Sequence, residues 1–383
     1  MNNFDCFIYN NGGMFLDLRL NYLNKYIDKS IIVVPKYKFL LKFWGLIGKK
    51  SMILVTGSAG YLGSHICKKL LDKNIPFYSI DNLSSGKFEN VFRKGFFKKI
   101  DYSSKQIKKL LLKKKISIII HAAAFTFPNE SEKNKKKYFV NNIEKTIKFI
   151  KYCSEVKIKK FIFFSTSNVY EFGGDIIRSA SEKANIKPKN YYGYTKLYIE
   201  RFLKKENLFE NLIILRIFNI AGFVEKFKYL EYKSRYRRIM PSIVSAINKN
   251  KSISIFGYQK KNCFSYATRD YLHIEDFTNL IIKLVNFKRN KNKIYNVGSG
   301  ICYSLKDLIN IFEKKLKKKI KCHLKILRKG ELIYTFCNNN KIIKEIKWYP
   351  KKNLNKIISS TIDWSKVKKW KYLTVLYFLM KKI

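Results

Sequence analysis

A tyrosine, a lysine and two hydroxyl side chains in this sequence could together move a proton. Tyr192 and Lys196 are four positions apart, so a helix would carry them on one face. A cation placed there lowers the pKa of the phenol, which lets tyrosine act as a base near neutral pH. This spacing is common by chance in a chain so rich in both residues. Here it follows an apolar run that ends at Ser165-Thr166, where a second hydroxyl can share a proton with a substrate.

A glycine-rich turn offers a second kind of chemistry. Gly57, Gly60 and Gly63 are spaced three and three between the apolar run 53–55 and a helical pattern. Such glycines permit a tight turn and let the backbone approach a pyrophosphate, while the following helix presents free N–H groups. Asp81 ends the next apolar run and is placed to accept from adenosine ribose hydroxyls. Because a carboxylate disfavours a 2′-phosphate, the pattern predicts NAD rather than NADP.

The elements that must hold these residues alternate along the chain. Strand-like runs separated by Lys-rich helical patterns occur at 52–56, 77–80, 117–121, 161–165 and 212–217. This alternation predicts an α/β fold with a Rossmann-type, doubly wound parallel sheet and helices on both faces. Beyond about 225 the pattern is mixed, with a strand-like run at 253–256 and helical stretches near 275–287, 304–318 and 353–363. We expect a smaller mixed α/β substrate-binding domain there.

These patterns suggest four parts of the chain. Residues 1–51 carry no recognisable chemistry, and they are either a genuine extension or an upstream artefact with Met52 as the true start. We expect a NAD-binding domain with the catalytic residues over 52–224, a mainly substrate-binding domain over 225–365 with some chain returning to the first domain, and a tail over 366–383.

Composition narrows the classes of function. The 383 residues are 46% hydrophobic, enough for a substantial core, and the net charge is +52. Lysines are spread over the whole length together with other residues of AT-rich codons, so codon drift explains the charge better than a selected nucleic-acid surface. A general positive field still favours a diphosphate ligand. The seven cysteines show no paired spacing, which predicts reduced thiols in a cytoplasmic protein. We expect no metal, because the four histidines are dispersed, and no membrane span.

Taken in order, these motifs resemble the UDP-glucose 4-epimerase family of the extended short-chain dehydrogenases/reductases. The resemblance extends from about Met52 to Trp364. It is carried by the blocks 56–65, 81–83, 121–123, 141–142, 165–170, 192–196, 215–219, 255–257, 269–273 and 328–331. Ser167-Asn168 follow Thr166, where related dehydratases have an Asp-Glu pair. The long connection 258–268 also favours the epimerase pattern over its relatives.

The resemblance implies a role for each matching residue. Thr166 and Tyr192 would relay the proton of the sugar 4-hydroxyl, with Lys196 tuning Tyr192. The cofactor would contact Gly57, Gly60, Tyr61, Leu62, Gly63, Asp81, Asn82, Asp101, Ala122, Ala123, Asn142, Tyr192 and Lys196. The UDP-sugar would contact Thr166, Phe218, Asn219, Arg238, Phe256, Arg269, Tyr271, Arg328 and Glu331. The resemblance also implies a homodimer.

Four positions depart from the family pattern. Thr126 replaces the usual Lys, Arg238 an Asn, Glu171 a Gly and Glu331 an Asp. They fall on cofactor and sugar-diphosphate contacts and leave the Thr, Tyr and Lys positions intact.

The expected reaction is a hydride transfer from sugar C4 to bound NAD and back to the opposite face, through a 4-keto intermediate. Thr335, four residues beyond Glu331, stands at the family's sugar gate and is small, so an epimerase of UDP-N-acetylglucosamine or of another nucleotide sugar is one alternative. A catalytically idle nucleotide- or nucleic-acid-binding protein is an alternative from another class.

Overall fold

The computed structural model describes residues 6–9, 15–18, 32–35, 52–92, 96–172, 177–224, 238–260, 263–287 and 292–365. The chain divides into two units, Met1–Lys50 and Ser51–Ile383. In the first, β1 (Cys6–Tyr9) pairs antiparallel with β2 (Phe15–Leu18) and β3 (Ile32–Pro35). The expected tail at 366–383 lies outside the described residues.

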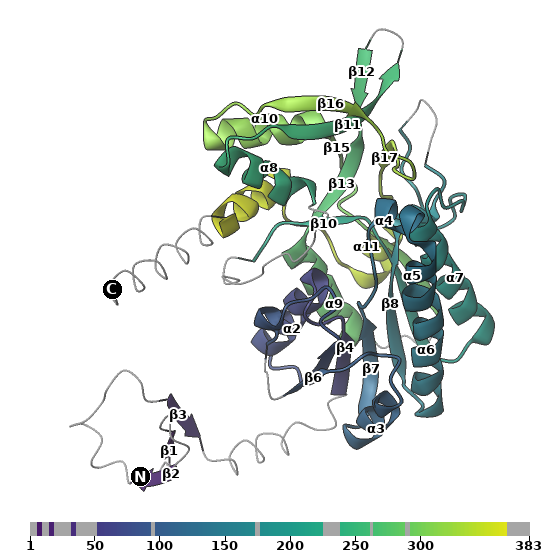
Figure 1. The fold of residues 1–383 in the computed structure, drawn as a ribbon. Coiled ribbons are helices and arrows are strands. Elements are labelled where there is room, and N and C mark those ends of the chain that lie inside the picture. The colour runs from purple at the N-terminus through teal and green to yellow at the C-terminus, as the bar shows by residue number, and fades with distance from the viewer. Residues whose placement is uncertain are drawn as a thin grey trace. The chain divides into compact units, whose positions relative to one another are not determined.

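The second unit is built on a seven-stranded parallel sheet (Figure 1). Its order is β14-β9-β8-β7-β4-β5-β6, and the five predicted strands form its centre. This confirms the predicted α/β fold class. The strands are β4 (Met52–Thr56), β5 (Phe77–Asp81), β6 (Phe97–Lys99), β7 (Ile116–His121), β8 (Lys160–Thr166), β9 (Asn211–Ile217) and β14 (Lys293–Val297). They run as almost continuous apolar sequence because both faces of a parallel sheet are covered.

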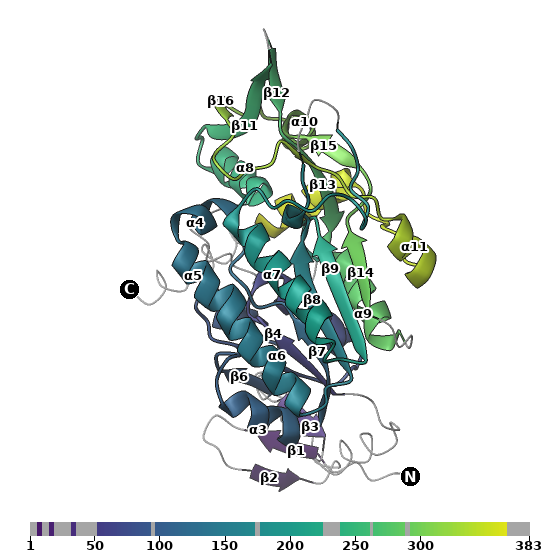
Figure 2. The same cartoon turned by 90° about the vertical axis from the view of Figure 1, so that its right-hand side faces the viewer.

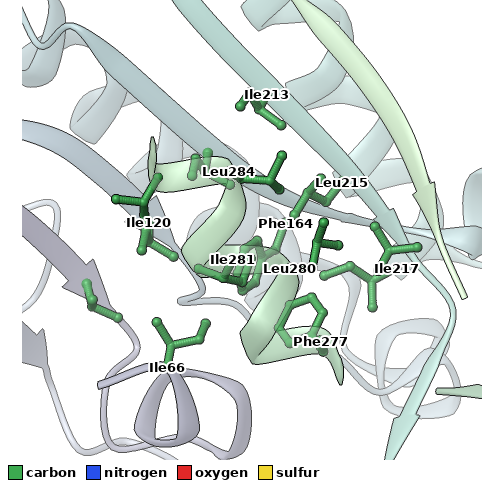
Figure 3. Packing of buried hydrophobic residues seen from close by; sticks show 14 of the residues in the cluster. Ile66, Ile120, Phe164, Ile213, Leu215, Ile217, Phe277, Leu280, Ile281 and Leu284 are labelled. Carbon is green, nitrogen blue, oxygen red and sulfur yellow. The ribbon is translucent and has the colours of Figure 1, made fainter. Parts of the chain in front are cut away.

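Helices cover both faces of this sheet, and alternate strand residues point to each. On one face α2 (Tyr61–Asp72) and α9 (Ile274–Asn286) pack against Ile120, Phe164 and their neighbours (Figure 3). On the other, α3 (Gln106–Lys113), α6 (Lys145–Glu155) and α7 (Tyr191–Glu206) cover Phe161 and Phe163 (Figure 2). The short helices α4 (Pro128–Lys133) and α5 (Lys135–Phe139) and a π-helical turn, Val140–Glu144, precede α6.

The later part of the chain adds two small sheets. One has the order β12-β11-β16, from β11 (Ile253–Lys260), β12 (Cys263–Tyr266) and β16 (Cys322–Ile326). The other joins β10 (Asn219–Ala221), β13 (Thr268–His273), β15 (Cys302–Ser304) and β17 (Tyr334–Thr335). Several of these strands have two or three residues, too few to show a period-two pattern in the sequence.

Helices close the core beneath these sheets. They are α8 (Ile239–Asn248), α10 (Leu305–Leu316) and a helix over 354–365, whose buried side chains form one cluster with Ile255 and Tyr271. The α11 helix (Asn340–Ile346) instead buries Ile342 and Ile346 in the core of the large sheet. No helix in the described part of the chain is long and apolar enough to cross a membrane.

Candidate functional site

The glycine turn between β4 and α2 is a place where backbone packs directly on backbone. Gly57 has a φ of +65°, and a Cβ there would lie 2.7 Å from the backbone nitrogen of Ala123. A Cβ on Gly63 would lie 2.1 Å from the Gly57 carbonyl oxygen. Gly60 is the N-cap of α2 and supplies no capping side chain. The turn is therefore shaped for close approach by a ligand at the helix N-terminus.

A cleft beside this turn is lined by six of the thirteen predicted cofactor residues. Its lining includes Gly57, Gly60, Asp81, Asn82, Ala122 and Ala123. The Asp81 carboxylate accepts from the Ala59 N–H at 3.0 Å and the Leu83 N–H at 2.7 Å. Burial raises the pKa of Asp81, and these two bonds oppose the rise. The carboxylate is thus held at the cleft wall by backbone donors.

Other predicted cofactor residues stand behind the lining. Asp101 accepts from Lys145 at 2.7 Å and from Asn82 at 3.0 Å. Burial raises the pKa of Asp101, but these bonds and those from Ser103 outweigh it and bring the pKa to about 2. Asn142 brackets the backbone of Phe125, which does line the cleft, accepting at 3.0 Å and donating at 2.9 Å.

The side chains of Tyr61 and Leu62 turn away from this cleft. The Tyr61 hydroxyl donates to the Gly222 carbonyl at 2.6 Å and lines a second cavity, described below. Leu62 packs against the core of the sheet.

The predicted proton-transfer residues meet where β8 ends against α7. Tyr192 and Lys196 are buried on α7, and Thr166 is the last residue of β8. The Lys196 ammonium donates to the Phe164 carbonyl at 2.7 Å. Burial lowers the pKa of Lys196 to about 7, with the Glu200 carboxylate opposing the shift. The Thr166 side chain lies beside that of Tyr192 and lowers the pKa of the phenol.

Burial dominates the electrostatics of Tyr192. It raises the pKa of the phenol, and Thr166 and the positive charge of Arg238 oppose the rise. The Lys196 ammonium is directed to the Phe164 carbonyl, and its expected tuning of Tyr192 stays a prediction. The helix spacing places both side chains on one face, whereas the strand end decides where the ammonium points.

A cavity of about 500 Å³ collects seven of the predicted substrate residues. They come from five segments of the chain and are Asn219, Arg238, Phe256, Arg269, Tyr271, Arg328 and Glu331. Thr166 and Phe218 are not among its lining residues. Phe218, which lies between β9 and β10, is buried in a cluster with Phe172 and Tyr334.

The charged groups of the cavity hold one another in place. Arg328 forms an ion pair with Glu331, and its guanidinium lies 4.4 Å from the centre of the Phe256 ring. Arg269 donates to the carbonyls of Thr268, Ile333 and Leu332 at 2.7 to 3.1 Å, and burial lowers its pKa. Cationic and aromatic walls of this kind suit a phosphorylated ligand with a planar base.

The sequence missed several residues that the structure brings to these sites. Ser84, Ser85 and Asn141 line the cleft, and Gly222 lines the cavity. Asn190 caps α7 by accepting from the Gly193 N–H at 2.9 Å. Asparagine is a preferred N-cap residue, so Asn190 could have been predicted from the sequence. The other residues could be assigned to these sites only from the folded structure.

Comparison with known proteins agrees with this geometry. The model of the "NAD dependent epimerase/dehydratase family" matches residues 53–298. A bifunctional UDP-glucose and UDP-xylose 4-epimerase of Arabidopsis thaliana is 29% identical, over 83% of this chain and 96% of the relative. The UDP-glucose 4-epimerase of Rhizobium meliloti is also 29% identical, over 82% of this chain and 96% of the relative.

Solved structures match the fold. The UDP-glucose 4-epimerase of Bifidobacterium longum in complex with NAD⁺ and UDP aligns with a TM-score of 0.76 and 23% identity, over 82% of this chain and 98% of that one. The UDP-N-acetylglucosamine 4-epimerase of Methanobrevibacter ruminantium gives a TM-score of 0.71 and 26% identity, over 84% and 99%. Together with the sequence relatives, these matches confirm the resemblance and the prediction of NAD.

Proposed function

The chain belongs to the NAD-dependent epimerase/dehydratase family, and we propose that it interconverts UDP-glucose and UDP-galactose through a 4-keto intermediate. One observation carries the proposal: Asn190, which caps the helix that bears Tyr192, donates to the Gly330 carbonyl at 2.9 Å. Gly330 lies between Arg328 and Glu331 of the 500 Å³ cavity, so the cavity wall adjoins the end of α7 that carries the proposed base.

The residues of the cleft fit a dinucleotide. The glycine turn leaves no room for a Cβ at Gly57 or Gly63, and Asp81 offers a carboxylate to ribose hydroxyls. Bound NAD supplies a hydride acceptor and returns the hydride. Lys196, which ends near the Phe164 carbonyl, is proposed to contact the nicotinamide ribose. Because the oxidation would be reversed within one turnover, the cofactor would not be consumed.

Tyr192 and Thr166 handle the proton in this proposal. Tyr192 takes the proton of the sugar 4-hydroxyl, directly or through Thr166, while the hydride leaves C4. Turning the sugar about its bonds to the diphosphate exposes the opposite face, and Tyr192 returns the proton there. In the cavity Arg328 would pair with diphosphate oxygens and Glu331 would accept from ribose hydroxyls.

A second substrate, UDP-N-acetylglucosamine, is favoured by one side chain. Thr335 is small and buried, and its hydroxyl accepts from the Asn219 amide at 3.0 Å, so it stands directly behind the cavity wall. Assays of both UDP-sugars at equal concentration decide between them.

The decisive experiment is turnover without added cofactor. Purified protein is incubated with UDP-galactose, and we expect UDP-glucose to form from the NAD that the protein carries. Tyr192→Phe should lose most of the turnover and keep its NAD. Tyr194→Phe is a matched control, because that tyrosine lies on the same helix and is 45% exposed. Near-normal activity of Tyr192→Phe would overturn the assignment.

We also propose a cytoplasmic homodimer. The described cysteines include Cys67, Cys153, Cys302, Cys322 and Cys337, all free thiols. Exposed aromatic side chains, Tyr194 and Tyr198 on α7 and Phe139 on α5, offer an apolar surface to a second copy. Light scattering after size exclusion tests the dimer, and a mass of one chain would contradict it.

A further inference from the structure

We propose that Asn168 is a positioning residue which makes the Thr166 hydroxyl a hydrogen-bond donor to Tyr192, an inference that rests on the proposed role of Tyr192 as base. Asn168 occupies a place where the related dehydratases carry an acid. Its contribution here is to fix a direction: Thr166 gives its proton toward Tyr192 and does not accept one from the sugar.

The orientation starts from the backbone of α7. The Gly193 N–H donates to Asn190 Oδ1 at 2.9 Å, which fixes which end of the Asn190 amide faces the helix. Asn190 Nδ2 therefore points outward. It donates to Asn168 Oδ1 at 2.8 Å and to the Gly330 carbonyl at 2.9 Å. Asn190 is 4% exposed, so water cannot replace these partners if the amide group turns over.

The Asn168 amide is fixed in turn. Because its Oδ1 accepts from Asn190, its Nδ2 faces Thr166 and donates to Thr166 Oγ1 at 3.1 Å. The backbone N–H of Asn168 donates to the same oxygen at 3.2 Å. A threonine hydroxyl has two lone pairs and one proton. Both lone pairs are used by Asn168, so the hydroxyl can enter any further bond only as a donor.

Tyr192 is the acceptor of that donation. The Thr166 side chain lies beside that of Tyr192 and lowers the pKa of Tyr192 against the rise that burial causes, so we assign Tyr192 as the acceptor of the Thr166 proton. A hydrogen bond donated to Tyr192 stabilises phenolate more than phenol. Of the two proton routes considered above, the direct one is left: Tyr192 phenolate takes the proton of the sugar hydroxyl, and the hydride leaves for NAD.

The packing of α7 keeps these groups in register. A Cβ on Gly193 would lie 2.4 Å from the Asn168 carbonyl oxygen, so only glycine lets the helix approach the turn Ser167–Val169 this closely. Asn190 also links the turn to Gly330, beside the Arg328–Glu331 pair of the cavity. The hydrogen bonds therefore connect Gly330, in the cavity wall, to the Thr166 hydroxyl beside Tyr192.

Asn168→Asp tests the direction of the bond. The substitution keeps an oxygen for Asn190 Nδ2 and replaces the Nδ2 donor by a carboxylate oxygen, which draws the Thr166 proton away from Tyr192. The readout is the ionisation of 3,5-difluorotyrosine placed at position 192, followed by ¹⁹F NMR in the NAD-loaded protein. Fluorination lowers the pKa of the phenol and so brings its titration into an accessible range.

The new carboxylate also raises the pKa of Tyr192 through its charge, so the comparison is made in two backgrounds. The charge of the new carboxylate raises the pKa of Tyr192 whether or not Thr166 is present. The loss of the hydrogen bond from Thr166 can raise it only when Thr166 is present. We expect the midpoint shift caused by Asn168→Asp to be larger, by about one pH unit, when Thr166 is present than in Thr166→Ala. Equal shifts in the two backgrounds would overturn the proposal.

Asn190→Ser provides an independent variant. Serine still caps α7, because its hydroxyl can accept from the Gly193 N–H, but it lacks the Nδ2 donor that orients Asn168. We expect the titration midpoint of Tyr192 to rise while the helix stays intact. An unchanged midpoint would count against the orientation of Asn168 by Asn190. The readout needs no turnover, so failure of UDP-galactose conversion would contradict the proposed function and leave this test standing.

Discussion

The two ends of the proposed site are built in different ways. At the glycine turn, backbone lies against backbone: a Cβ on Gly63 would come within 2.1 Å of the Gly57 oxygen. In the cavity, side chains lie against side chains, and Arg328 is 53% exposed while it pairs with Glu331. Backbone cannot move aside locally, whereas an exposed guanidinium can. Changes at the turn should therefore affect stability and NAD together, and changes in the cavity only nucleotide affinity.

The strongest test of this difference is Gly63→Ala. The new methyl would meet the backbone of Gly57 and Ser58, and overpacking against rigid neighbours costs roughly 3 kcal/mol. We expect the free energy of unfolding in urea to fall by about that amount and the purified protein to lack NAD. Gly60→Ala is the control for stability alone, because its Cβ meets only the Gly57 oxygen, at 3.2 Å, while Gly60 itself lines the cofactor cleft. A Gly63→Ala protein with normal stability and bound NAD would contradict the rigid turn.

Asp81→Asn examines the same end without adding volume. The carboxylate is proposed to accept from ribose hydroxyls, and bonds to a charged acceptor contribute roughly 1.5 to 3 kcal/mol. We expect the dissociation constant for NAD to rise about ten- to a hundredfold, with weaker discrimination against NADP. Calorimetry with UDP should give unchanged affinity, since Asp81 lies in the cleft and not on the cavity wall. A parallel loss of UDP binding would show that the two ends are not independent.

The sequence predicted the turn better than the cavity, for a physical reason. The glycines, Tyr192 and Lys196 lie on contiguous segments whose local geometry follows from spacing, so their neighbourhood could be inferred. Asn219 and Glu331 reach one cavity only because β10 and β17, the short strand that follows Glu331, both pair with β13. Their assignment came from the family resemblance rather than from periodicity.

The spacing of residues in the sequence could not predict which side chains would be buried. Tyr192 and Lys196 were correctly expected on one helix, but the pKa of Tyr192 is raised because neighbouring elements exclude water from it. Likewise Phe218 was assigned to the substrate site from the family resemblance, and its side chain is buried in a hydrophobic cluster instead. Side-chain direction at a strand end depends on what packs there.

The pH dependence of stability should distinguish the buried Lys196 from the exposed Arg328. Burial lowers the pKa of Lys196 to about 7, well below its value in an unfolded chain. As pH rises above about 7 the folded protein releases this proton while the unfolded chain keeps it, so stability increases with pH. We expect Lys196 to contribute a gain of about 2 kcal/mol between about pH 7 and 9.

Urea unfolding of wild type and Lys196→Met across this range measures that gain. Lys160, whose pKa burial lowers to about 8, contributes to both proteins, so the difference between their slopes is the readout. Arg328→Met should keep the wild-type slope, because an arginine stays protonated throughout. Identical slopes for wild type and Lys196→Met would mean that the ammonium is not enclosed as described.

The smallest effect is expected at the open end, from Arg328→Lys. Lysine keeps the positive charge but loses the planar contact with Phe256 and the paired N–H donors. A cation–π contact at an exposed position contributes about 0.5 to 1 kcal/mol, so the dissociation constant for UDP should rise about two- to fivefold. Lys329→Arg is the neighbouring control and should bind UDP normally. Melting temperature and NAD content should not change, because the guanidinium makes no contact with the glycine turn. A loss of NAD in Arg328→Lys would show that the cavity and the glycine turn are not independent.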